Sequence, residues 1–229
     1  MDHGLAHVKP TEKLGETTAP DGAIINLYRH DGAYVMVVDG IELMSTRRVQ
    51  SEVQLAELVC APLNAAVAPS VLIGGLGFGM TLQAALRVLP ADARVVVSEI
   101  VPDVVTWNLN SDWALAGAAM HDPRVTVRTM DVYQVMRENI GAYDAVMLDV
   151  DNGAESFTTG SNKKLYGEKG IRTGIAALKP GGRLAYWSVD SEPTFVKALR
   201  RAGLTVSVHR IRSHATSGGF NSVIVARRS

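Results

Sequence analysis

Three glycines and a later glutamate have the residue types and spacing of a nucleoside-binding site. Gly75, Gly77 and Gly79 follow the apolar run Val71–Ile73. Glycine lets a ligand approach the backbone and adopts positive φ angles, so such a turn between a buried strand and a helix can hold a nucleotide. Glu99 comes about 20 residues later, where a carboxylate can accept hydrogen bonds from both ribose hydroxyls. A loop that serves only packing is the alternative.

Two aspartates follow later predicted strands. Asp131 comes after Val125–Thr129 and can accept a hydrogen bond from an adenine amino group or cap the next helix. Asp149 follows Ala145–Leu148, and functional groups of open α/β sheets lie beyond the carboxyl ends of the strands. Because an ordinary aspartate pKa is about 3.9, we expect Asp149 to position a substrate rather than act as a strong base. Its alternative is a capping role.

The glycine spacing discriminates between nucleotides. The dinucleotide motif G-x-G-x-x-G needs a glycine where Met80 stands, and the triphosphate motif G-x-x-x-x-G-K-[ST] is absent. The observed G-x-G-x-G spacing resembles motif I of S-adenosylmethionine-dependent methyltransferases. We therefore predict S-adenosylmethionine as the donor substrate. Its expected contacts are the loop and the residues beside two strand-end acids: Gly74, Gly75, Gly77, Gly79, Glu99, Ile100, Asp131 and Val132.

Composition argues against several other functions. The 23 basic and 23 acidic residues cancel, so no broad positive field attracts nucleic acid. No apolar run approaches the ~20 residues of a membrane span, and the first residues lack a signal-peptide core, so we expect a cytoplasmic protein without a membrane partner. Cys60 is the single cysteine, and its apolar neighbours predict a buried thiol. No spacing of histidine, cysteine and aspartate indicates a metal site.

The elements that must position these residues form three predicted regions. Residues 1–22 are polar and predict a flexible arm. Residues 23–66 predict a β-hairpin region with Asp-Gly turns, followed by a helix. Residues 67–229 alternate strands and helices and end in two directly joined strands. They predict an α/β, Rossmann-like class I methyltransferase fold, a mostly parallel seven-stranded sheet with a C-terminal antiparallel hairpin.

Apolar periodicity predicts the individual elements. Strands are expected at Ile24–Tyr28, Tyr34–Val38, Ile41–Met44, Ser70–Ile73, Arg94–Ser98, Val125–Thr129, Ala145–Leu148, Arg183–Ser188, Thr205–Arg212 and Asn221–Ala226. Helices are expected near residues 49–64, 80–88, 102–109, 132–139, 163–178 and 191–202.

These features together resemble the spermidine synthase-like, or polyamine aminopropyltransferase-like, branch of this fold. The resemblance covers about residues 34–187 and includes the entry hairpin Val38–Ser45, the glycine loop, the segment Asp122–Val125 and the strand-end acids. The hairpin is the more specific part, because ordinary methyltransferases do not begin with one.

The resemblance implies a role for each strand-end acid. Glu99 is expected to bind the ribose of the donor, Asp131 its adenine, and Asp149 is expected to lie beside the amine that attacks the donor. Such proteins are often dimers, so the resemblance also implies a homodimer.

Three departures from the pattern of that branch bear on the reaction. Gly77 replaces the loop aspartate that faces the donor's aminopropyl amine, the motif after the fourth strand becomes Asp149–Gly153, and Trp187–Asp190 replaces an acceptor-binding segment. A buried ammonium needs a carboxylate partner. A glycine instead exposes backbone N–H groups, which suit the carboxylate of intact S-adenosylmethionine, so we expect the intact donor.

The predicted function is transfer from S-adenosylmethionine to a small molecule, most simply methyl transfer to an amine or another heteroatom. Aminopropyl transfer from the decarboxylated donor to a polyamine-type amine is the alternative, and a non-catalytic nucleoside-binding or interaction protein is the third reading. Asp149 is the predicted catalytic residue. The candidate acceptor contacts, each of which can also be a solvated surface residue, are Asp151, Asn152, Tyr166 and Glu52.

Overall fold

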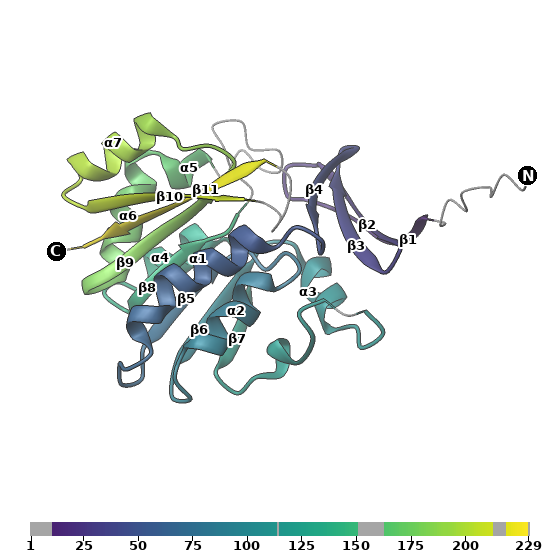
Figure 1. Cartoon of the computed structure of the whole chain (residues 1–229), viewed down its shortest axis with the longest axis horizontal. Helices are drawn as coiled ribbons and strands as arrows, with labels where there is room; N and C mark the ends of the chain where they lie inside the picture. Colours follow the sequence, from purple (N-terminus) through teal and green to yellow (C-terminus); the bar gives the residue numbers. More distant parts are fainter. Residues whose placement is uncertain (1–10, 114, 151–162, 213–218, 229) are drawn as a thin grey trace, which may run out of the picture.

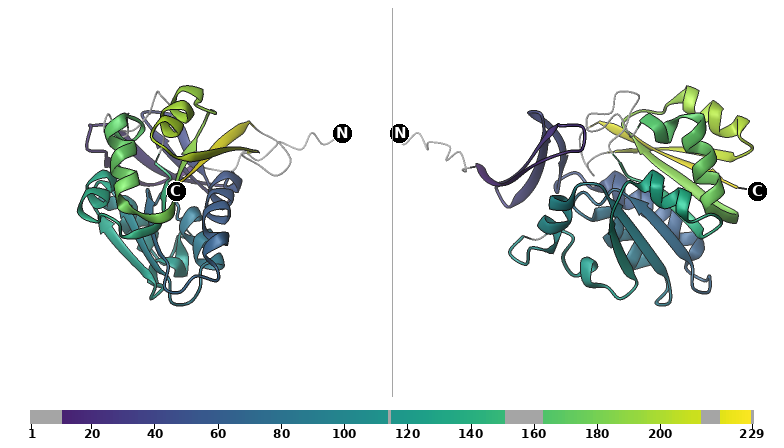
Figure 2. Two further views of the ribbon diagram at one scale, coloured as in Figure 1. Left: turned by 90° about the vertical axis from the view of Figure 1, so that its left-hand side faces the viewer. Right: turned by 180° about the vertical axis from the view of Figure 1, so that it is seen from behind.

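The computed structural model describes residues 11–113, 115–150, 163–212 and 219–228, which form two β-sheets (Figure 1). A four-stranded antiparallel sheet lies at one end, and a seven-stranded sheet with helices on both faces forms the rest. The small sheet projects from the main body in two further views (Figure 2). The predicted α/β fold with an N-terminal hairpin region is confirmed.

The N-terminal sheet is a meander in which each strand pairs with the next. Its strands are β1 (Thr11–Thr18), β2 (Ile24–His30), β3 (Ala33–Val38) and β4 (Ile41–Ser45). The turns Asp31-Gly32 and Asp39-Gly40 have positive φ at both residues. Two-residue hairpin loops need this conformation because it matches the twist of the flanking strands.

The larger sheet has the order β10-β11-β9-β8-β5-β6-β7. Its strands are β5 (Ser70–Gly74), β6 (Arg94–Glu99), β7 (Val125–Thr129), β8 (Tyr143–Leu148), β9 (Leu178–Ser188), β10 (Thr205–Arg212) and β11 (Phe220–Arg227). Strands β5 to β9 are parallel, and β11 is antiparallel to both of its neighbours. The chain continues from β5 to β6 on one side and later returns to β8 on the other. The carboxyl end of β5 is therefore the point where open α/β sheets bind ligands.

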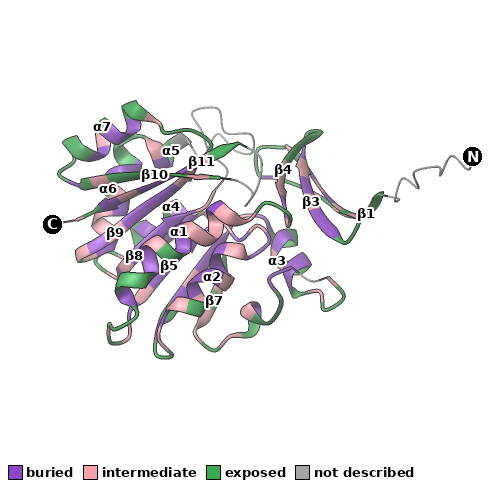
Figure 3. Cartoon of the chain, viewed as in Figure 1, coloured by how far each residue is buried: buried purple, intermediate pink, exposed green. Residues whose placement is uncertain are grey.

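Helices cover both faces of the larger sheet. One face carries α1 (Gln50–Cys60), α2 (Met80–Val88) and α3 (Pro102–Leu109), and the other carries α4 (Val132–Glu138), α5 (Lys163–Tyr166), α6 (Glu168–Ala177) and α7 (Pro193–Arg201). Two apolar cores fill the layers between helices and sheet (Figure 3). Helix α1 packs on β8 to β11, so it belongs to the larger sheet. Among the described helices, none combines the length and apolarity that a bilayer crossing requires.

The predicted flexible arm is wrong for Thr11–Thr18, which form β1 and pair along β2. Leu14 is the one large apolar side chain of this strand and packs against the core, so no alternation of apolar residues reveals the strand in the sequence. It is ordered by backbone pairing and by contacts with α3: the Thr17 hydroxyl donates to Asp103, and Gly15 lies against Trp107. A Cβ atom at Gly15 would come within 2.8 Å of Nε1 of Trp107, so this contact depends on the missing side chain.

Two boundaries differ from the predicted ones. The helix expected at 163–178 is divided at Gly167, whose extended backbone (φ −81°, ψ 169°) caps α6. Strand β9 begins at Leu178 rather than Arg183, although the intervening residues include a proline and two glycines. Its pairing with β8 jumps there, from Tyr143 opposite Leu178 to Ala145 opposite Arg183, so the strand contains an irregularity that a sequence pattern presents as a turn.

Cys60 ends α1 within the core. Its side chain is fully buried, and burial raises the pKa of its thiol to about 12. The prediction of a buried thiol is confirmed.

Substitution of Gly75 tests the close approach of β5 and β8. A Cβ atom at Gly75 would lie 2.1 Å from the carbonyl oxygen of Asp149, whereas one at Gly203 would meet nothing within 4 Å. The two φ angles are nearly equal, +90° and +88°. We expect Gly203→Ala to cost roughly 1–2 kcal/mol of unfolding free energy, and Gly75→Ala roughly 1–3 kcal/mol more. Urea unfolding of both variants measures the difference, and equal midpoints would contradict it.

Candidate functional site

A cleft of about 710 Å³, including its open mouth, lies between the carboxyl ends of the parallel strands and the N-terminal sheet. Strand-end residues form one side, and apolar residues of the N-terminal sheet and its turns form the other. The second group comprises Ala19, Ile25, Met36, Leu43 and Met44. The small sheet thus covers the ligand-binding edge of the larger one with apolar surface.

The glycine loop between β5 and α2 is connected to both neighbouring strands. The backbone N–H of Gly75 donates to the Ser98 carbonyl at 2.8 Å, and the loop residues Gly75, Gly77 and Gly79 all have positive φ. Gly75 and Gly77 line the cleft. Sequence reasoning missed Asn108, a buried α3 residue whose amide donates to the Gly77 carbonyl at 2.8 Å. Its only signal is a polar residue within an apolar helix.

The other two glycines that were predicted as ligand contacts pack closely against neighbouring elements, and their contact with a ligand stays a prediction. A Cβ atom at Gly74 would come within 2.7 Å of Val132, and one at Gly79 within 2.5 Å of Ala116. Neither glycine is among the residues that line the cleft. Their small size therefore serves the fit of α4 and of the segment before the 3₁₀ helix Gly117–His121.

Glu99 lies at the bottom of the cleft and is 8% exposed. Its carboxylate accepts hydrogen bonds from the backbone N–H groups of Leu76 and Val101, both at 2.9 Å. Burial raises the pKa of Glu99, and the backbone donors oppose this effect. The carboxylate is therefore held in one orientation beside the loop. Its predicted contact with a ribose stays a prediction.

Asp131 forms the helix cap expected from the sequence and also borders the cleft. Its carboxylate accepts from the backbone N–H of Tyr133 at 2.9 Å and so caps α4, and the residue also lines the cleft. The adjacent expected contacts Ile100 and Val132 line the cleft as apolar wall. An adenine contact at Asp131 stays a prediction.

Asp149 is half-buried at the end of β8. Its backbone N–H donates to the Gly74 carbonyl at 2.8 Å, and its carboxylate accepts a short hydrogen bond from the Thr81 hydroxyl. Burial, together with the nearby Glu52 carboxylate, raises the pKa of Asp149 to about 7, and the Thr81 hydrogen bond opposes this shift. The expectation of an ordinary pKa is wrong. A carboxylate with a pKa near neutrality can take a proton from a substrate.

Glu52 comes together with Asp149 in a second, smaller cavity. The hydroxyl of Ser51 donates to the Glu52 carboxylate at 2.6 Å, and burial raises the pKa of Glu52. Asp149 and Met44 line both this cavity and the main cleft, so the two spaces adjoin. Glu52, expected from the sequence as an acceptor contact, thus lies close to the predicted catalytic residue.

None of the other expected acceptor contacts is seen at the site in the part of the chain that the structure describes. Tyr166 donates to the Trp187 carbonyl at 3.2 Å and packs against the rings of Tyr186 and Phe195, and it lines neither cavity. Asp151 and Asn152 lie outside the described residues.

The described lining of the two cavities is acidic. It carries the carboxyl groups of Glu52, Glu99, Asp131 and Asp149, and it includes no lysine, arginine or histidine. A chain whose charges cancel overall therefore concentrates negative charge at one cleft. Such a cleft favours cationic ligands. Across the described part of the chain, no group of His, Cys, Asp and Glu is arranged to hold a metal ion.

One curated protein is similar to this chain in sequence. No protein-family model matches the chain. The chain is 29% identical over 140 residues to a polyamine aminopropyltransferase of Corynebacterium efficiens, a match that covers 60% of this chain and 26% of the relative. It thus spans about a quarter of the length of that curated relative.

Solved structures match over almost the whole chain. A spermidine synthase in complex with the transition state analogue AdoDATO matches with a TM-score of 0.73 at 17% identity, covering 95% of this chain and 73% of that one. The chain has the spermidine synthase fold. Spermidine synthase from Thermotoga maritima matches with a TM-score of 0.72 at 18% identity, covering 95% of this chain and 73% of that one. A probable spermidine synthase from Corynebacterium glutamicum matches with a TM-score of 0.66 at 16% identity, covering 93% of this chain and 79% of that one. The predicted resemblance to the spermidine synthase-like branch is confirmed.

Substitution of Asp149 by asparagine tests its raised pKa. Because the folded state holds a proton up to about pH 7 and the unfolded state only up to about 3.9, the stability of the natural chain falls as pH rises between these values. Asp149→Asn does not titrate. We therefore expect it to unfold at similar denaturant concentrations as the natural chain at pH 4 and to be roughly 2–4 kcal/mol more stable at pH 8.

The exposed Asp112 provides the control for this comparison. Asp112→Asn removes the same charge and should follow the natural chain at both pH values. A stability gain for Asp149→Asn that does not change with pH would contradict the raised pKa.

Proposed function

We propose that the chain is a transferase that moves an aminopropyl group from decarboxylated S-adenosylmethionine to an amine. The observation that carries the proposal is the acidic lining of the cleft and of the adjoining cavity, whose described residues carry four carboxyl groups and no basic side chain. Donor and acceptor of this reaction are both cations. The sequence relative named as a polyamine aminopropyltransferase supports the same reaction.

The charge of the cleft bears on the choice of donor. Intact S-adenosylmethionine carries a carboxylate, which would have to lie among acidic groups. The decarboxylated donor carries a sulfonium and an ammonium, and each gains from a nearby carboxylate. This reverses the preference for methyl transfer that Gly77 suggests in the sequence. That argument considered one loop position, whereas Glu52 and Asp149 bring acids from two other elements.

The space beside Gly77 is filled by an apolar side chain rather than by an acidic one. A Cβ atom there would lie 2.7 Å from the terminal methyl group of Met44 on β4. The place of a loop side chain is thus taken by a thioether from the N-terminal sheet. In the proposed reaction, Met44 packs against the methylene groups of the donor's tail, and the ammonium at its end lies near Asp149.

The proposed reaction is a displacement at carbon. The acceptor ammonium first loses a proton, the nitrogen lone pair then attacks the aminopropyl carbon bonded to sulfur, the C–N bond forms, and the C–S bond breaks. Its electron pair returns to sulfur, which leaves as the neutral thioether methylthioadenosine. Asp149 takes the proton that the nitrogen loses, because the bound cations favour the ionised form of a carboxyl group whose pKa in the free chain is about 7. The protein otherwise aligns nitrogen, carbon and sulfur and excludes water.

The strand-end acids have matching roles in this proposal. Glu99 accepts from the ribose hydroxyls and Asp131 from the adenine amino group, as the resemblance implies. A homodimer and a cytoplasmic location stay predictions.

Product identification tests the reaction directly. We expect the chain, given decarboxylated S-adenosylmethionine and a panel of primary amines, to form methylthioadenosine and an aminopropylated amine in equal amounts by mass spectrometry. Intact S-adenosylmethionine should bind more weakly in calorimetric titration. S-adenosylhomocysteine together with a methylated amine would instead establish methyl transfer. Absence of binding for both donors would favour the non-catalytic reading.

Proton release on donor binding tests the acidic cleft. Burial raises the pKa values of Glu52, Glu99 and Asp149, and the pKa of Asp149, at about 7, leaves that group partly protonated near neutral pH. A bound cation favours the ionised form and lowers these pKa values. We therefore expect donor affinity to rise from pH 6 to pH 8 and protons to be released on binding. Calorimetry in two buffers of different ionisation enthalpy measures this release.

Methylthioadenosine is the matched control ligand, because it has the same nucleoside without the sulfonium charge. It should release fewer protons than the donor does. Equal release by the two ligands would mean that charge neutralisation does not drive donor binding.

A further inference from the structure

We propose that Glu52 binds the ammonium group of the acceptor opposite Asp149, so that the small cavity selects primary amines borne on an alkyl chain. This inference rests on the proposed function and assigns its acceptor subsite. It concerns a residue of α1, outside the strand ends that hold the donor.

The arrangement of the two cavities carries this inference. Asp149 and Met44 form a wall shared by the donor cleft and the smaller cavity, and Glu52 lines only the smaller one. An amine bound between Glu52 and Asp149 therefore lies beside a carboxylate that also borders the donor cleft. Displacement requires the nucleophile to reach the donor carbon directly, from the side opposite the sulfur.

Glu52 is held in place by the fold. Ser51 is 1% exposed, and its hydroxyl donates to the Glu52 carboxylate while accepting from the Asn221 amide of β11 at 3.0 Å. The Thr81 hydroxyl, which donates to Asp149, also lies 3.5 Å from the backbone carbonyl oxygen of Glu52. The two carboxyl groups are thus fixed by α1, α2, β8 and β11 before any ligand binds. Fixed groups lose little conformational entropy when they bind a substrate.

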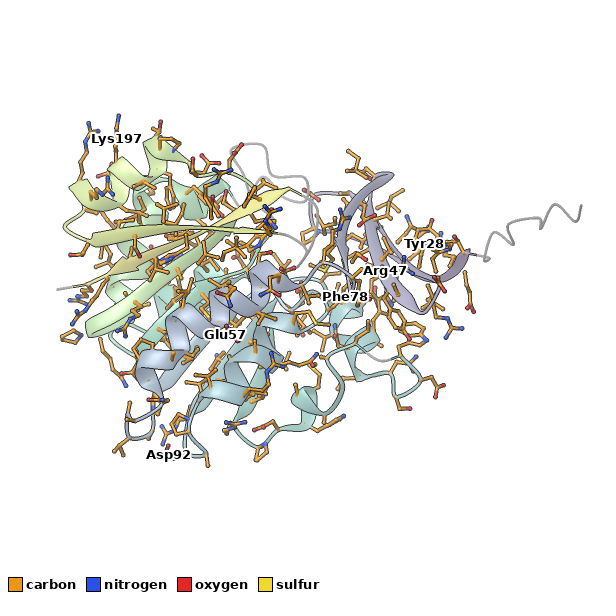
Figure 4. All side chains as sticks on the ribbon, viewed as in Figure 1. Tyr28, Arg47, Glu57, Phe78, Asp92 and Lys197 are labelled. Atoms are coloured by element: carbon orange, nitrogen blue, oxygen red, sulfur yellow. The ribbon has the colours of Figure 1, made fainter. Side chains whose placement is uncertain are left out.

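The other walls of the cavity define the class of acceptor. Apart from Ser45 and the two acids, the described lining is apolar: Met44, Val49, Leu76, Phe78 and Met80. Phe78 lies where the main body meets the N-terminal sheet (Figure 4). Such walls suit methylene groups, and the two acids suit one cationic nitrogen. The cavity therefore matches a primary alkylammonium ion better than an alcohol, a thiol or an anion.

The charged groups around Asp149 allow a specific prediction about pH. Glu52 faces it from α1, and Glu99 and Asp131 line the same cleft from β6 and the start of α4. The lining residues that the structure describes include no basic side chain. Loss of the Glu52 charge therefore removes repulsion on Asp149 and lowers the pKa of Asp149. A purely structural residue would not produce this change.

The test compares Glu52→Gln with Glu57→Gln. Glu57 lies on the same helix, is exposed and accepts from Gln54 at 2.6 Å, so its substitution removes an equal charge outside both cavities (Figure 4). With saturating donor, we expect Glu52→Gln to raise the KM for a primary alkylamine at least about tenfold. The acidic limb of its kcat/KM profile should move to lower pH by about one unit. Glu57→Gln should match the natural chain in both quantities, because Glu57 lines neither cavity.

A second variant and a stability measurement keep the result interpretable. Glu52→Asp retains the charge, so its acidic limb should stay close to that of the natural chain even if its KM rises. Because Glu52→Gln removes the repulsion between Glu52 and Asp149, we expect its melting temperature to be no lower than that of Glu57→Gln.

The outcomes separate this inference from the proposed function. Turnover in which Glu52→Gln matches Glu57→Gln in both KM and pH profile overturns the role of Glu52 and leaves the aminopropyl transfer intact. Donor binding without turnover of any amine by the natural chain overturns the proposed function, and the acceptor subsite with it. A raised KM together with the shifted acidic limb supports both.

Discussion

The site depends on the close backbone approach at the carboxyl ends of β5, β6 and β8. Gly74 accepts from the N–H of Asp149, and the missing side chain of Gly75 leaves room for the Asp149 carbonyl oxygen. On the other side of β5, the N–H of Gly75 donates to Ser98, one residue before Glu99. Two acids from different strands therefore have fixed positions relative to one loop. A larger residue at position 75 would separate the strand ends that carry them.

The N-terminal sheet converts this strand edge into an electrostatically unusual cleft. Apolar residues of β2, β3 and β4 cover the acids, so water stabilises their ionised forms less than it would on an open surface. The Thr81 hydroxyl and the backbone donors to Glu99 offset only part of this cost. The fold thus holds carboxyl groups whose ionised forms are poorly solvated, and a cationic ligand would stabilise those forms. Natural proteins accept such strain mainly where function requires it.

Much of the fold was predictable because its information is local. Buried parallel strands are continuous apolar runs, and Asp-Gly turns and glycine clusters mark where they end. Glu99 and Asp149 were predictable for the same reason, since parallel strands bring their carboxyl ends to one edge. Strand β1 was not, because Leu14 is its one large apolar side chain and the strand is ordered mainly by its partner strand and by the contact of Gly15 with Trp107.

The proximity of Glu52 to Asp149 was less predictable because it depends on packing between distant segments. Glu52 approaches Asp149 only because α1 lies across β8 to β11, and sequence spacing carries no sign of this. Thr81 was missed because it looks like an ordinary residue of the first turn of α2. The argument for intact S-adenosylmethionine was incomplete for a related reason. It considered Gly77 alone, and the charge of a cleft is a sum over every element that lines it.

The single thiol of the chain gives an independent view of this architecture. Cys60 is fully buried where α1 packs on the sheet, and its high pKa keeps it protonated and unreactive in the folded protein. A thiol-reactive dye can therefore modify the chain only when α1 separates from the sheet. Because the sequence has no second cysteine, the rate of that modification reports the opening of one helix, the same helix that carries Glu52.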